Sequence, residues 1–179
     1  MLYTILIVIA AVVLALVGFI AMRRADFCIT RSATMSAPPA AVFAQVNDFH
    51  NWDAWSPWAK LDPNMKQTYE GAPAGTGAVY MWNGDNKVGE GRMTILESQP
   101  SHLIRIKLEF MRPFAATNIS EFTFKPEDNK TVVTWSMSGR HNFMAKAFML
   151  FMNMDKMVGG DFEKGLASMK AIVEGVPQA

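Results

Sequence analysis

The chain has 179 residues, and its 17 Lys and Arg against 16 Asp and Glu give a formal net charge of +1. This balance, without a basic stripe or a run of like charges, argues against a nucleic-acid partner. The single cysteine excludes an internal disulfide. After the first 24 residues, enough chain remains for one domain with its own core.

A long apolar run opens the chain. Leu2 to Met22 contains no charged side chain, and Arg23 and Arg24 follow at once. As a helix the run is roughly 31 Å long, which matches the ~30 Å hydrocarbon core of a bilayer. A cleaved signal peptide would carry positive residues before a shorter run and end in a small-x-small site. We therefore predict a retained transmembrane anchor over residues 1–24 and a globular domain over residues 25–179.

The basic residues near the run predict its orientation. Arg23, Arg24 and Arg31 follow the run, and no Lys or Arg precedes it. The positive-inside rule then predicts a single-pass protein of the cell inner membrane whose C-terminal domain is cytoplasmic. The lone thiol of Cys28 fits a reducing compartment.

The domain is predicted to begin with a strand and two short helices. Phe27 to Met35 alternates apolar and polar residues, which is typical of a half-buried strand. Ser36, a capping residue type, and the prolines after it predict the start of a helix. Phe49, Trp52 and Trp55 are spaced to share one side of a short helix.

Alternation and turn residues predict six further strands, and helix follows them. The predicted strands are Met65–Glu70, Ala78–Trp82, Val88–Glu97, Leu103–Phe110, Thr117–Lys125 and Val132–Gly139. The remainder is predicted to be helical, with one apolar stripe at steps of three or four: Met144, Phe148, Phe151, Met154, Val158, Phe162, Leu166, Met169 and Val173. Gly159 and Gly160 are expected to permit a bend or a close approach to a neighbouring backbone. Antiparallel hairpins with helices on one face predict an α+β domain.

Three stretches carry a family resemblance. They are Ala37–Phe43 with Trp52, Trp55, Ser56, Pro57 and Trp58; Gly89–Ile95 with Pro100; and Asp155–Gly159 with Asp161–Leu166. In this order they resemble the START-like (SRPBCC) superfamily, in its bacterial polyketide cyclase/dehydrase-like branch, which often has an N-terminal hydrophobic segment. The resemblance covers Phe27 to Glu174. It implies a helix-grip fold, a curved antiparallel sheet around a long C-terminal helix that encloses an apolar cavity.

The superfamily does not imply one activity. The 14 Met, 12 Phe and 5 Trp suit either a packed core or an adaptable apolar cavity. The leading hypothesis is a membrane-tethered carrier or sensor of a lipid-like or other hydrophobic small molecule. One alternative is a polyketide cyclase/dehydratase-like enzyme. Another is a membrane-anchored interaction module with a filled core and no ligand. No cofactor, metal or nucleic acid is expected.

Aromatic and apolar residues are the main candidates for the cavity wall, with ordinary core packing as the alternative for each. They are Trp52, Trp55, Trp58, Tyr80, Trp82, Phe110, Trp135, Met137, Met154, Val158 and Phe162. The first three are expected to form a lid whose indole N–H groups hold a polar ligand end. Glu90 and Arg92 are two apart on one strand face and can pair with each other, as a surface ion pair or at a ligand headgroup. Glu90 is also the first candidate for acid/base chemistry, since no strong catalytic motif is present.

Overall fold

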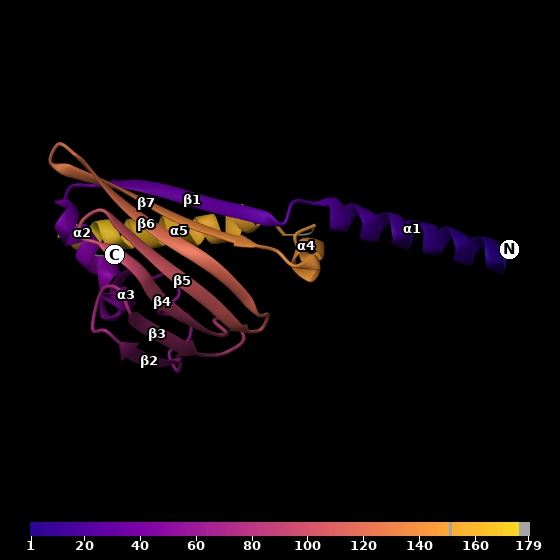
Figure 1. Ribbon diagram of the computed structural model, residues 1–179, viewed down its shortest axis with the longest axis horizontal. Helices are drawn as coiled ribbons and strands as arrows, with labels where there is room; N and C mark the ends of the chain where they lie inside the picture. The colour runs from indigo at the N-terminus through magenta and orange to yellow at the C-terminus, as the bar shows by residue number, and fades with distance from the viewer. Residues whose placement is uncertain (151, 176–179) are drawn as a thin grey trace.

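A computed structural model describes residues 1–150 and 152–175 of the chain (Figure 1). Helix α1 (Leu2–Met22) extends away from the remainder of the molecule. It is long and apolar enough to cross a membrane, and only Ile20 among its residues is buried. Because α1 buries almost nothing against the domain, it is not a core helix.

Seven antiparallel strands form one sheet in the order β1-β7-β6-β5-β4-β3-β2. The strands are β1 (Asp26–Met35), β2 (Lys66–Gly71), β3 (Ala78–Asn83), β4 (Glu90–Gln99), β5 (Leu103–Arg112), β6 (Ala116–Glu127) and β7 (Lys130–Arg140). From β2 to β7 each strand pairs with the next one along the chain. Strand β1 pairs with β7 and forms the edge of the sheet opposite β2. The predicted strands are confirmed, with shifts of at most two residues at their ends.

Helices cover one face of this sheet. They are α2 (Pro39–Asn47), the short helix η1 (Phe49–Asn51), α3 (Trp52–Trp55) and α5 (Met154–Val173). This arrangement confirms the predicted α+β helix-grip fold. The predicted cap of the first helix is wrong, because α2 begins after Pro38 with no side-chain cap. The Ser36 N–H instead donates to the carboxylate of Glu174, 2.6 Å away, and so joins β1 to the end of α5.

The C-terminal region contains two helices rather than one. Helix α4 (Phe143–Phe148) and α5 each begin at an asparagine whose side chain accepts a backbone N–H: Asn142 from Ala145 at 2.8 Å and Asn153 from Lys156 at 3.0 Å. These two caps separate the apolar residues that the sequence stripe joined. Of that stripe, Phe151 lies outside the described residues.

Gly159 was expected to permit a bend or the close approach of a neighbouring backbone, but it lies against a side chain instead. Helix α5 continues through Gly159 and Gly160, and the side chain packed on Gly159 is the guanidinium of Arg31 from β1. Arg31 Nη2 lies 3.0 Å from Asp155 Oδ2, and its Nε lies 2.6 Å from Glu163 Oε1. Gly159 thus leaves space for an ion pair that holds α5 against the sheet.

Candidate ligand-binding site

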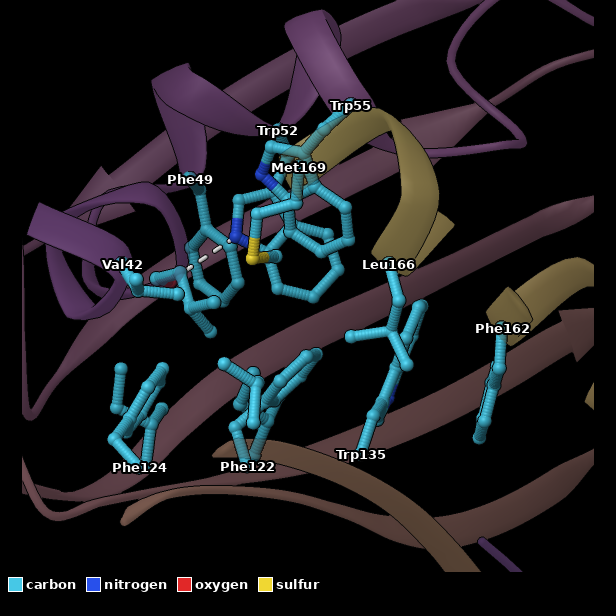
Figure 2. Close-up of a cluster of buried hydrophobic side chains, with 14 of the residues drawn as sticks. Val42, Phe49, Trp52, Trp55, Phe122, Phe124, Trp135, Phe162, Leu166 and Met169 are labelled. Atoms are coloured by element: carbon cyan, nitrogen blue, oxygen red, sulfur yellow. Dashed lines mark hydrogen bonds between the residues drawn. The ribbon is translucent and has the colours of Figure 1, made fainter. Parts of the chain in front are cut away.

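Aromatic rings fill the space between the sheet and α5 (Figure 2). Trp135 of β7 stacks on Phe162 of α5 with 3.9 Å between ring centroids and 9° between planes. Trp135 also stacks with Phe122 of β6, with 4.8 Å between ring centroids. The Trp135 indole N–H donates to Ser120 Oγ at 2.9 Å. The sheet and the long helix are therefore joined at this point by direct aromatic packing.

Trp52 and Trp55 belong to this core and do not form a lid. Both are buried, and their rings lie 4.6 Å apart. Their indole N–H groups donate to backbone carbonyls of α2, from Trp52 to Val46 and from Trp55 to Gln45, each at 3.0 Å. Because these donors are used, the expectation that they hold a ligand's polar end is wrong. They instead fix α3 to α2.

The candidate residues divide by burial into two sets. The buried set is Trp52, Trp55, Trp82, Trp135, Met137 and Phe162. The half-buried set, packed against that core but partly exposed, is Trp58, Tyr80, Phe110, Met154 and Val158. Trp58 places its edge on both Trp135, at 5.9 Å, and Phe162, at 6.3 Å. The half-buried set is thus the part of the candidate site that solvent reaches.

Glu90 and Arg92 do not pair with each other. The Glu90 carboxylate accepts from Arg112 Nε at 2.7 Å, and Arg112 also donates to Asn83 Oδ1 at 2.8 Å. The Arg92 Nε atom is buried without a hydrogen-bond partner in the described structure. In its strand Arg92 alternates with the buried Gly91 and Met93, so its side chain leaves the sheet on the face away from the core. The predicted pair is therefore wrong, and Arg92 does not line the interior.

The sequence prediction missed the buried polar residues. Among the described residues these are Asn118, Ser120 and Thr131, and none of the three is an acid or a base. Ser120 bonds to Trp135, and the Thr131 hydroxyl donates to the carbonyl of Ala37 at 2.7 Å. A signal was present, because Asn118 and Ser120 continue the alternation of Phe122 and hence share its inward face.

Asn118 differs from the other two. The residue is only 6% exposed, and its side-chain amide has no hydrogen bond to any described residue, but its polar atoms are still reached by solvent. On the neighbouring strand its cross-strand partner is Gly139, where a Cβ would collide with the Asn118 side-chain oxygen. Gly139 therefore provides room for the amide. An inward-facing amide with unused donors and acceptors is a group to which the polar atom of a ligand can bind.

Two open hollows lie elsewhere, where α1, β1 and α4 meet. Their volumes are about 500 and 400 Å³. Both hollows are lined by Arg23, His141 and Met149. Of the candidate cavity residues, Met154 alone lines a hollow, the larger of the two. His141 stacks on Phe27 at 4.4 Å, and burial lowers the pKa of its imidazole. The hollows are thus at the α1 end of the domain, outside the aromatic core.

Comparisons with known proteins agree with this architecture. A protein from Chromobacterium violaceum is similar, with a TM-score of 0.60, 17% identity, and coverage of 84% of this chain and 98% of that one. The Aha1 dimer from Colwellia psychrerythraea gives 0.60 at 12% identity, covering 83% and 96%. Ara h 8.0201 gives 0.55 at 12% identity, covering 84% and 99%.

These likenesses show the helix-grip fold that the sequence predicted. None of the curated proteins matches the chain. The sequence profile of the family described as polyketide cyclase/dehydrase and lipid transport matches residues 26–174, which is most of the chain and all of the sheet and α5. The chain therefore belongs to the polyketide cyclase/dehydrase and lipid transport family.

Proposed function

We propose that this protein is a membrane-tethered domain that binds a lipid-like or other hydrophobic small molecule, as a carrier or a sensor. Family membership supports a domain for hydrophobic ligands. The observation that carries the proposal is Asn118, whose side chain lies on the inner face of the sheet, is nearly buried, and has no hydrogen-bond partner among the described residues. A hydrogen bond to this amide is worth about 0.5–1.5 kcal/mol net. A ligand with one polar end and an apolar body can make this bond while its body packs on the apolar side chains of the interior.

The ligand's apolar body is expected to contact the half-buried set. Trp58, Phe110, Met154 and Val158 pack on the aromatic core without being enclosed by it. Methionine is unbranched and has several rotatable bonds, so Met154 adapts to guests of different shape. Entry of a ligand then needs movement of partly exposed side chains and leaves the stacked pair of Trp135 and Phe162 in place.

The tether is proposed from α1 and the residues after it. The helix is long and apolar enough to span a bilayer, and it leaves the domain with its side chains exposed. Arg23 and Arg24 follow it directly. Under the positive-inside rule they favour an inner-membrane protein with a cytoplasmic domain. Tethering would keep the domain within reach of membrane-dissolved ligands.

The experiment is ligand recovery from the full chain in lipid nanodiscs. Small molecules are extracted from wild type, Asn118→Leu and Thr117→Leu, and from empty nanodiscs, and quantified by mass spectrometry. Thr117 is the matched control, since it is adjacent but exposed on the opposite face of β6. We expect a hydrophobic species enriched with wild type and with Thr117→Leu, and reduced about tenfold with Asn118→Leu, the loss of one good polar contact. No enriched species, or equal amounts in all variants, contradicts the proposal.

One observation favours a second candidate, an interaction module without a ligand. The interior is occupied by its own aromatic side chains, with Trp135 and Phe162 in stacking contact. Nanodiscs that yield no enriched species would support this candidate. The enzyme alternative is not proposed, because the buried polar residues of the described chain include no acid or base for the general acid/base chemistry that it needs.

A further inference from the structure

The end of the domain nearest α1 exposes large apolar side chains. Phe143, Met144 and Phe148 of α4 are 42%, 73% and 57% exposed, and Met152 after the helix is 37% exposed. We call these four residues the α4 patch. Scattered exposed apolar residues are ordinary, but a group on one short helix marks a contact surface.

The α4 patch lies beside the end of the proposed anchor. The Lys146 ammonium, on α4, donates to the carbonyls of Ala21 at 2.9 Å and Arg23 at 3.1 Å. Figure 1 shows α4 directly beside the point where α1 leaves the domain. Met152 lines the same open hollow as Arg23. If α1 spans a bilayer, this connection places α4 at the depth where headgroups meet acyl chains.

The charges around the patch fit a lipid surface. Arg23 and Arg24 form no ion pair within the described residues, and α4 itself carries Lys146 and no acidic residue. The nearest carboxylate along the chain, Asp26, lies 3.9 Å from Arg140 at the paired ends of β1 and β7. Apolar side chains next to unpaired cations are typical of segments that lie in the interface of a membrane with anionic lipids.

We propose that the α4 patch docks on the surface of the bilayer that α1 crosses, with its apolar side chains in the interface and Arg23, Arg24 and Lys146 near anionic headgroups. The proposal rests on the proposed tether, which keeps lipid permanently at a high effective concentration. Docking would fix the orientation of the domain relative to the bilayer. Because β6 begins and β7 ends at this same end of the sheet, it would also bring Asn118 toward the membrane.

Site-specific quenching in vesicles tests the proposal with the full chain. Cys28→Ser removes the lone cysteine, and a nitrobenzoxadiazole dye is attached to Val12→Cys in α1, Met144→Cys in α4 or Asn129→Cys in the β6–β7 turn. The vesicles contain phosphatidylcholine, about one-third phosphatidylglycerol, and nitroxide-labelled lipid. All three positions are exposed, so the labels leave the core intact.

We expect strong quenching at Val12 and Met144, at least about twofold above that at Asn129, and a decrease at Met144 when phosphatidylglycerol is left out. Quenching at Val12 but not at Met144 would keep the tether and overturn the docking, leaving the patch to a protein partner. Quenching at Met144 but not at Val12 would keep the lipid contact and overturn the tether. Quenching equal to that at Asn129 at both sites overturns both.

Discussion

The interior of the domain and helix α4 contain the same types of apolar residue, but these residues are buried in the interior and exposed in α4. Between α5 and the sheet, Phe162 and Met169 are 1% and 0% exposed. In α4, Phe148 and Met144 are mostly exposed. The interior residues face a sheet that has already collected aromatic rings, whereas α4 faces the end of α1 and solvent. The high content of Met and Phe in this chain therefore has two sources, the packed core and an exposed apolar surface on α4.

The largest effect is expected from the interior. Trp135→Ala removes two stacked ring contacts and the bond to Ser120. We expect the free energy of unfolding to fall by about 3–5 kcal/mol, the range for a large aromatic residue truncated in a core. Urea unfolding in detergent, followed by circular dichroism, measures the loss. Trp58→Ala, at a half-buried ring, is the control and should cost clearly less; equal losses would contradict the division into two sets.

The adjacent glycines of α5 give a smaller and sharper test. A Cβ at Gly159 would lie 2.9 Å from Arg31 Nε and closer still to its Cζ and Nη2, whereas a Cβ at Gly160 meets open space. Gly159→Ala should displace Arg31 and cost about 1–3 kcal/mol, as overpacking does. Gly160→Ala should stabilise the helix by up to about 1 kcal/mol. Thermal unfolding of both variants measures these changes in stability. A Gly159→Ala variant more stable than wild type would show that Arg31 can move aside at no cost in stability, which contradicts the prediction.

Most of the fold was predictable because its signals are local. Alternation in Leu103–Phe110 and Val132–Gly139 depends only on which face of a strand is buried. The division between α4 and α5 was missed, because the apolar steps continue across it while the Asn153 cap interrupts the helix. Arg31 shares the inward face of β1, but its carboxylate partners lie more than a hundred residues away in α5. A sequence pattern on one strand does not identify such partners.

The candidate site was predictable in composition but not in detail. The aromatic residues do gather between α5 and the sheet, yet the sequence could not distinguish a ring that lines a cavity from one that fills it. That outcome depends on how Trp135 and Phe162 stack, which is a property of tertiary packing. Glu90 illustrates the same limit, because its partner Arg112 comes from the neighbouring strand and not from position 92.

A pH-dependent effect is expected where α5 meets β1. The hydrogen bond from Arg31 lowers the pKa of the Asp155 carboxyl below its ordinary 3.8 and raises that of the guanidinium. The stabilisation by this pair is therefore complete above that ordinary value and is lost as the pH falls through the lower value in the folded protein. Melting temperatures of wild type and Asp155→Asn should differ by a constant amount from about pH 5 to 7 and converge once the pH has fallen below the lowered pKa of Asp155. Glu163, which also faces Arg31, is present in both proteins and serves as the internal control. A difference that persisted at the lowest pH would assign the effect to packing.

The smallest expected change in stability is at the α4 patch, because its side chains are exposed and contribute little to folding. Phe148→Ser leaves the aromatic core untouched and should alter the free energy of unfolding by no more than about 0.5 kcal/mol. The same replacement at Phe162 should cost several times more, because it opens a cavity and buries a hydroxyl beside Trp135. If Phe148→Ser is as destabilising as Phe162→Ser, α4 belongs to the core and its exposure has no interfacial meaning. If stability is kept while lipid quenching at Met144 decreases, then the exposed rings of α4 contribute to membrane contact instead of folding. Two phenylalanines in one domain would then separate the energetics of the fold from those of its attachment.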